Sequence, residues 1–238
     1  MSLLQVNPLL CIRSPRDMDN PTFKKVKRSF EDIRNICKQV WFKYYNGVQV
    51  GNQINKYVCD HDEYTHVIIA TDDIIFSEQK FTHHIKKAVN YPVLSGCCNV
   101  NRGSWGKCLD CEDPEKEHKY LSVTFKLVKY PITGQQCYDH VSLEWAKVHP
   151  NIYPVYYQGN VLTMLSRDLF LKIGGLKHAY TPGEGLPTDL GFAEDLRKIN
   201  VKQYVDFRLI CEHICTKFEH IEKNKDSFIM EASHQYKP

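Results

Sequence analysis

The stretch VIIATDD at residues 67–73 places a short apolar run directly before two carboxylates. Such a continuous run is typical of a strand that is buried on both faces, as in a parallel sheet. Ligands of open α/β sheets bind outside the carboxyl ends of these strands. Adjacent carboxylates repel unless a cation or hydrogen bonds hold them, and their oxygens suit Mg²⁺ or Mn²⁺. Asp72 and Asp73 are therefore candidate metal ligands; the alternative is an ordinary turn or helix cap.

Strand and helix patterns alternate on either side of this stretch. A short apolar run at 9–12 predicts a first strand, and apolar residues at helical spacing between 23 and 37 predict an amphipathic helix after it. Further elements are expected as strands at 40–45, 92–96, 120–128, 155–165 and 203–207, and as helices around 52–59, 81–89, 166–175 and after 188. This alternation predicts an α/β fold with a single, mostly parallel central sheet flanked by helices.

The bulk composition fits one domain over residues 1–238. A hydrophobic content of 42% supports one sizeable core, and a formal net charge of +3 is too small to indicate nucleic-acid binding. Neither a signal peptide nor an apolar run of membrane-spanning length is visible. We therefore expect a cytoplasmic protein without a transmembrane segment, in which peripheral membrane association stays open. The tail from about residue 217 is charged and weakly patterned.

Ten cysteines in a chain without a visible export signal favour free thiols or a metal site over disulfides. Cys108 and Cys111 have the spacing of half a zinc site. Cys97 and Cys98 would be the source of two more thiolates, which predicts a structural Zn²⁺ that holds a polar excursion at about 97–118. The alternative is a set of unpaired buried thiols beside a polar loop.

Two later acids and one histidine are further candidates. Asp189 lies at an expected helix N-terminus, where it can act as a general base towards a hydroxyl, or simply stabilise the helix through its dipole. Glu194 follows five positions later and is not on the same helix face. His213 comes after the last clear strand, and a neutral imidazole is a good metal ligand, although a lone histidine is more often an ordinary surface or core residue.

The order of these parts resembles the glycosyltransferase family 2 pattern on the GT-A fold. The resemblance is carried by QGNVLTMLSRDLFLKIGGL at 158–176, TDLGF at 188–192, YVD at 204–206 and then His213, all after an acidic motif at the end of a strand. It covers roughly residues 9–213. The acidic motif is a doublet here, without the acid–spacer–acid form of the family. The resemblance implies a GT-A-like fold with a Rossmann-like nucleotide-binding half.

The resemblance also implies a metal-dependent sugar transfer. Asp72 and Asp73 would hold Mn²⁺ or Mg²⁺ against the diphosphate of a nucleotide sugar, and His213 would complete the metal site. Asp72 would contact the nucleotide as well. The donor would be a UDP- or GDP-sugar, and the acceptor a glycan, a lipid-linked group or a protein.

Further roles follow from the same resemblance. Arg13, Ser14 and Gly96 would lie near the nucleotide. Asp189 would deprotonate the acceptor hydroxyl, with Glu194 as the second candidate for that base. A base opposite the leaving group would invert the anomeric centre.

Two other functions remain open at this point. A nucleotidyltransferase acting on a sugar phosphate would use the same acidic pair, but it usually has a glycine-rich loop after the first strand, and RSPR at 13–16 has no glycine. A non-catalytic, zinc-clipped α/β module would bind a partner and tolerate Asp73→Asn. A dinucleotide-dependent oxidoreductase is disfavoured, because no Gly-x-Gly-x-x-Gly follows any strand.

Overall fold

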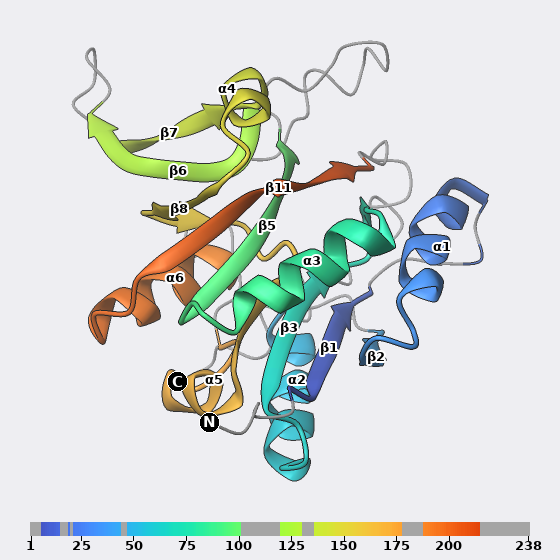
Figure 1. The fold of residues 1–238 in the computed structure, drawn as a ribbon. Helices are drawn as coiled ribbons and strands as arrows, with labels where there is room; N and C mark the ends of the chain where they lie inside the picture. The colour runs from blue at the N-terminus through green and yellow to red at the C-terminus, as the bar shows by residue number, and fades with distance from the viewer. Residues whose placement is uncertain are drawn as a thin grey trace, which may run out of the picture.

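The computed structural model describes residues 6–14, 19, 21–43, 47–100, 120–129, 136–177 and 188–214. In these ranges the strands are β1 (Pro8–Arg13), β2 (Lys38–Phe42), β3 (His66–Thr71), β4 (Ile74–Ile75), β5 (Val93–Val100), β6 (Tyr120–Lys129), β7 (Gln136–Ser142), β8 (Ile152–Val155), β9 (Tyr157–Gln158), β10 (Thr163–Ser166) and β11 (Gln203–His213). The helices are η1 (Pro21–Phe23), α1 (Lys24–Asp32), α2 (Gly47–Asp60), α3 (Glu78–Ala88), α4 (Leu143–Val148), α5 (Arg167–Lys172) and α6 (Thr188–Lys198) (Figure 1).

The central sheet has the strand order β2-β1-β3-β10-β5-β11-β4. Strands β2, β1 and β3 pair in parallel, and so do β5 and β11. Strand β10 lies between β3 and β5 and runs antiparallel to both, so β3 and β5 share one direction. The predicted α/β fold with a mostly parallel central sheet is therefore confirmed.

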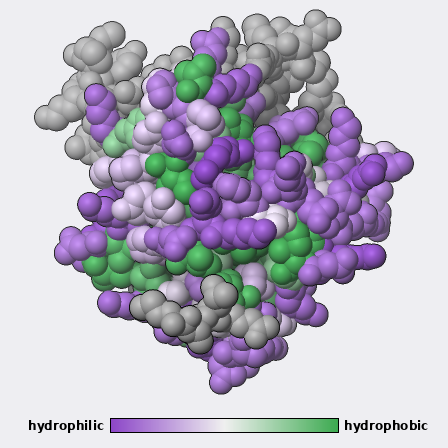
Figure 2. All heavy atoms as spheres, in the orientation of Figure 1, coloured by the Kyte–Doolittle hydropathy of each residue, from purple (hydrophilic) through white to green (hydrophobic). Residues whose placement is uncertain are grey.

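Helices cover both faces of this sheet because successive strand residues point to opposite sides. Leu10 and Ile12 of β1 belong to a core cluster that includes residues of α1 and α3. Leu9 and Cys11 belong to a second cluster with residues of α2, α5 and α6. In Figure 1, α3 lies across the face of the sheet nearer the viewer, and Figure 2 shows a mainly hydrophilic surface on this side. The result is a helix–sheet–helix sandwich.

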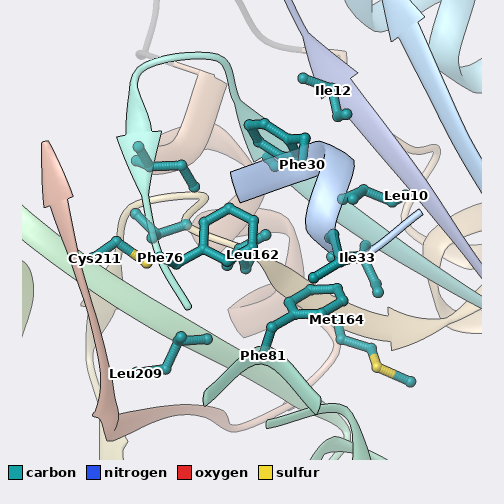
Figure 3. Packing of buried hydrophobic residues seen from close by; sticks show 14 of the residues in the cluster. Leu10, Ile12, Phe30, Ile33, Phe76, Phe81, Leu162, Met164, Leu209 and Cys211 are labelled. Atoms are coloured by element: carbon teal, nitrogen blue, oxygen red, sulfur yellow. The ribbon is translucent and has the colours of Figure 1, made fainter. Parts of the chain in front are cut away.

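Phe30 is the anchor of α1 in the first cluster (Figure 3). It is fully buried, and its ring meets Trp41 and Phe76 edge-on at centroid distances of 5.1 and 5.2 Å. We expect Phe30→Ala to lower the free energy of unfolding by about 3–5 kcal/mol, because it removes buried area and leaves a cavity. Urea titration followed by circular dichroism measures this loss. Val148→Ala, at a 72% exposed position, should change stability by less than about 0.5 kcal/mol; equal effects of the two substitutions would contradict this packing.

A smaller antiparallel layer extends from the end of β5. Strand β6 pairs with β5, β7 and β9, and its buried residues share a third cluster with Phe207 of β11 and Leu143 of α4. Figure 1 shows β6, β7 and α4 together above the central sheet. Most of the predicted excursion at 97–118 and the tail from 217 lie outside the described residues.

Three predicted elements differ from the structure. The strand predicted at 155–165 is three short strands, β8, β9 and β10, with an irregular segment at 159–162 before β10. The strand predicted at 203–207 continues to His213 as β11. The helix predicted at 52–59 is the longer α2, Gly47–Asp60. The first difference matters most, because the segment at 159–162 lies beside the carboxyl end of β3, where the acidic pair follows.

Candidate active site

The ends of β1 and β3 bring three candidate residues to one edge of the sheet. Arg13 pairs in register with Thr71, so the two parallel strands end side by side. Their backbone contact continues beyond the strands, because the amide of Asp72 donates to the carbonyl of Arg13 at 3.2 Å. The amide of Ser14 donates to the carbonyl of Phe42 at 3.0 Å, which ties it to β2. Arg13, Ser14 and Asp72 therefore lie at the edge where α/β sheets bind ligands.

Asp73 and His213 meet at the same edge although 140 positions separate them. Strand β4 pairs with the end of β11, with Ile74 opposite His213. The amide of Ile214 donates to the carbonyl of Asp73 at 2.7 Å. These backbone contacts leave His213 Nε2 at 3.2 Å from Asp73 Oδ2, with both side chains mostly buried. A carboxylate oxygen and an imidazole nitrogen, which are two potential metal ligands, thus lie side by side.

Arg13 is a cation among three carboxylates. Burial lowers the pKa of its guanidinium, and the charges of Asp189, Asp73 and Asp72 act in the opposite direction. Arginine nevertheless stays protonated in proteins. The guanidinium therefore links Asp189, from the first turn of α6, electrostatically to the acidic pair after β3.

Asp189 is held in place by two hydrogen bonds. The hydroxyl of Tyr157, in β9, donates to Asp189 Oδ2 at 2.5 Å. The amide of Leu190 donates to Asp189 Oδ1 at 3.1 Å, as expected for an acid in the first turn of a helix. Tyr157 was not a candidate in the sequence, because a tyrosine in an aromatic, strand-like run carries no local sign of a functional contact.

Glu194 lies apart from this cluster. Its carboxylate forms an ion pair with Arg197 on the next turn of α6, and Arg197 also donates to the carbonyl of Tyr156 at 2.7 Å. Glu194 is not among the charges that act on Arg13, whereas Asp189 is the first of them. The neighbouring Asp195 is 5% exposed and pairs with two lysines, which gives it a structural role. Of the two predicted bases, only Asp189 joins the acidic pair.

The metal site stays a prediction. Among the described residues, no three His, Cys, Asp or Glu side chains come together in a way that would hold a metal ion. Asp73 and His213 would supply two ligands, and Mg²⁺ or Mn²⁺ commonly takes its remaining ligands from substrate phosphates and water. A mixed carboxylate and imidazole pair suits Mn²⁺ better than Mg²⁺. Asp72 is fully buried, and its carboxylate forms no three-ligand group with other described residues.

Several buried polar atoms in this region have no hydrogen-bond partner among the described residues. They are Arg13 Nε, Ser14 Oγ, Gln158 Nε2 and both polar ends of Asn160. Buried polar groups are nearly always paired in folded proteins, so such a group is a sign of a missing ligand or water. Arg13 and Ser14 were predicted to lie near a nucleotide. Asn160 was not singled out, although it lies in the segment that carries the family resemblance; only its burial marks it.

The turn beside Asn160 is supported by a charged network. His84 Nε2 donates to the carbonyl of Leu162 at 3.1 Å, and His84 Nδ1 lies 3.8 Å from Asp206 Oδ2. Arg208 reaches the two oxygens of Asp206 at 2.7 and 3.1 Å. Burial acts to raise the pKa of Asp206, but His84 and Arg208 outweigh it and hold that pKa well below its usual range. Asp206 therefore stays ionised beside His84, which in turn contacts the backbone of Leu162.

Gly96 has a packing role, and its contact with a nucleotide stays a prediction. Its amide donates to the carbonyl of Val161 at 2.9 Å, so this donor is already used. A Cβ at this position would lie 2.9 Å from the carbonyl oxygen of Leu209 in β11. The glycine is needed because two neighbouring strands approach closely here.

Cys97 and Cys98 do not converge on one ion. They are successive residues of β5, and Cys97 belongs to the cluster around β6, whereas Cys98 belongs to the cluster around α1 and α3. Burial raises the pKa of the Cys97 thiol well above its usual value, which disfavours the thiolate that binds zinc. Cys108 and Cys111 lie outside the described residues. A structural zinc site therefore stays a prediction, without this thiol pair as one half of it.

Comparison with known proteins supports the fold alone. No protein-family model matches the chain, and no curated protein matches it either. Among solved structures, A197 from STIV superposes with a TM-score of 0.55 at 15% identity over 89% of this chain and 87% of that one. GalNAc-T7, solved with UDP, GalNAc and Mn²⁺, superposes with a TM-score of 0.52 at 7% identity over 89% of this chain. The fold is GT-A-like.

This chain spans 44% of the length of that GalNAc-T7 chain, so the likeness concerns only part of it. At identities this low, similarity carries over the arrangement of the elements, and the function has to be argued from the site itself.

In the described ranges, none of the helices combines the length and the apolar character that crossing a bilayer requires.

Proposed function

We propose that this protein is a glycosyltransferase that moves a sugar from a nucleotide-diphosphate donor to an acceptor hydroxyl with the help of a divalent cation. The main support is the meeting of three features at one edge of a GT-A-like sheet. These are the Asp73–His213 pair, the Arg13 cation and the Asp189–Tyr157 pair. Together they offer a cation site, a positive charge for phosphate and a carboxylate for a proton.

The donor would lie over the ends of β1 and β3. Asp73 and His213 would hold Mn²⁺, and the bound cation would neutralise charge on the departing nucleoside diphosphate. Arg13 and Ser14 have buried polar atoms without partners, which suits them to donate to phosphate or ribose oxygens. GalNAc-T7, which has a similar fold and was solved with UDP, GalNAc and Mn²⁺, supports a nucleotide-sugar donor.

The acceptor hydroxyl would approach Asp189. The hydrogen bonds from Tyr157 and from the amide of Leu190 fix its carboxylate. A carboxylate fixed near the acceptor can take the hydroxyl proton as the new bond forms. If the hydroxyl attacks from the side opposite the diphosphate, the configuration at the anomeric centre is inverted. This outcome agrees with the expectation from the resemblance to family 2.

Calorimetric titration of the full chain with UDP and GDP, each with and without Mn²⁺, tests this function. We expect one of the two nucleotides to bind, and its affinity to rise at least about tenfold with Mn²⁺, because the cation joins the diphosphate to Asp73 and His213. The nucleotide that binds identifies the donor base. Absence of binding by either nucleotide under all metal conditions would contradict the proposal and favour a non-catalytic binding module.

Tyr157→Phe tests the support of the proposed base. Loss of the hydroxyl removes a hydrogen bond to a charged group, so we expect kcat to fall roughly 10–100-fold, while KM for the donor stays within about twofold. Release of UDP or GDP from a nucleotide sugar measures both constants. Tyr91→Phe removes the same hydroxyl from the turn after α3 and should leave both unchanged. An increase in KM without a fall in kcat would show that Tyr157 serves donor binding instead.

A further inference from the structure

Asn160 is a buried amide with both ends unpaired. The residue is 3% exposed, and neither Nδ2 nor Oδ1 has a hydrogen-bond partner in the part of the chain that the structure describes. Burying an amide in this state is costly, and native proteins rarely leave both its donor and its acceptor unsatisfied. A water or a ligand that completes these bonds is therefore expected.

The position of Asn160 in the sheet points to a ligand. Strand β10 begins at Thr163, which pairs with Ile69 near the end of β3. The segment 159–162 that leads into β10 therefore lies at the edge where β3 ends and the acidic pair follows. The amide of Gly96 donates to the carbonyl of Val161, which ties this segment to β5 as well. Three positions before Asn160, Tyr157 holds Asp189 at the same edge.

The backbone around Asn160 is fixed by hydrogen bonds, although the Asn160 side chain forms none with the described residues. Ser95 Oγ lies 3.2 Å from the carbonyl oxygen of Gly159 and 3.0 Å from that of Val161. A Cβ on Gly159 would lie 3.0 Å from the Cβ of Ser122, so a larger residue here would have to displace Ser122 by a few tenths of an ångström.

Leu162 has a φ of +52°, a left-handed conformation that is uncommon for leucine. Its carbonyl accepts the hydrogen bond from His84. Backbone strain of this kind persists where the surroundings enforce it, and it clusters at functional sites. The backbone around Asn160 is therefore preorganised, as binding sites require.

We propose that Asn160 binds hydroxyl groups on the sugar of the nucleotide-sugar donor and thereby selects that sugar. This rests on the proposed glycosyltransferase function. A carboxamide supplies two donor hydrogens and an acceptor oxygen, which match hydroxyl groups that both donate and accept. Its neutral charge suits a sugar ring, whereas the diphosphate has Arg13 and a cation at the same edge. A site built on a buried polar group also rejects analogues that lack the matching hydroxyl.

The test compares nucleotide and nucleotide-sugar binding to Asn160→Leu and Asn160→Ala. Calorimetry with Mn²⁺ uses UDP, UDP-glucose, UDP-galactose and their N-acetylamino forms, together with GDP and GDP-mannose. We expect both variants to bind the free nucleoside diphosphate within about twofold of wild type, and to bind the preferred nucleotide sugar roughly 10–100-fold more weakly. Asn52→Leu, an exposed site on α2, is the matched control and should change neither affinity.

A second readout needs no ligand. Because Asn160→Leu replaces an unpaired buried amide with an apolar side chain of similar size, we expect the melting temperature of the free protein to rise by about 2–4 °C. The alanine variant removes the amide without added bulk, so it carries the binding test if leucine does not fit.

The outcomes separate the two levels of inference. If wild type binds no nucleotide, both the proposed function and the role of Asn160 fail. If wild type binds and the variants lose UDP or GDP and the nucleotide sugar equally, only the assignment of Asn160 to the sugar fails. Unchanged affinity for every sugar in the variants would likewise overturn it. A selective loss for the sugar-bearing ligand supports it.

Discussion

Asp189→Asn is expected to lower kcat by about 10²–10⁴-fold while donor affinity stays within about twofold of wild type. The amide keeps the size and shape of the carboxylate but cannot accept the proton of the acceptor hydroxyl. Its one carbonyl oxygen can still accept from the amide of Leu190, and its NH2 group can donate to the Tyr157 hydroxyl oxygen, so the fold around it should persist. Initial rates of UDP or GDP release, with an acceptor or with water, measure the effect.

Glu194→Gln is the matched control, since it makes the same chemical change five positions along the same helix. Its carboxylate pairs with Arg197 and lies outside the group of charges around Arg13, so we expect kcat to change by less than about threefold. A large loss in Glu194→Gln with little effect of Asp189→Asn would assign the base to Glu194. Equal losses would indicate that α6 as a whole positions the site.

Asp73→Asn is expected to abolish the increase in nucleotide affinity that Mn²⁺ causes, and to lower kcat/KM by at least about 10²-fold. A neutral amide is a much weaker ligand for a hard cation than a carboxylate, and in the described part of the chain the proposed cation would depend on Asp73 and His213. The backbone contact from Ile214 to the carbonyl of residue 73 is independent of the side chain. Loss of function should therefore come without a large loss of stability.

Titration of Asp73→Asn with the bound nucleotide, with and without Mn²⁺, measures this coupling, and thermal unfolding checks the fold. Asp168→Asn is the control: it is an exposed acid in the first turn of α5, which follows β10 at the opposite edge of the sheet. That variant should keep the full metal effect. Retention of the Mn²⁺ effect in Asp73→Asn would remove this residue from the cation site.

Much of the architecture could be predicted locally. The apolar run before Asp72 is a buried strand because four consecutive apolar residues need cover on both faces of a sheet. The apolar residues around Phe30 recur at helical spacing and form the buried face of α1. In both cases the hydrophobic pattern matches the period of the element. The order of such elements was enough to predict a mostly parallel sheet, whereas the GT-A-like arrangement was implied by the family resemblance of the motifs between 158 and 213.

Local pattern failed where tertiary contacts override it. The apolar stretch 155–165 looks like one strand, but its middle turns at Leu162 in a left-handed conformation held by His84. Strand β11 continues past Phe207 because β5 and β4 offer it partners, and the sequence of β11 alone does not reveal them. Pairing of this kind depends on residues about 100 positions away.

The sequence by itself therefore determined the fold class, the acid pair at the end of β3 and the presence of acids in α6. Only the tertiary structure decided which of these groups meet. Asp73 contacts His213 across 140 positions, and Asp189 rather than Glu194 acts electrostatically on the Arg13 cation. Asn160 is buried without a hydrogen-bond partner among the described residues. The physical reason is that hydrophobic periodicity is a local property of a chain, whereas a site depends on the register between strands that are distant in sequence.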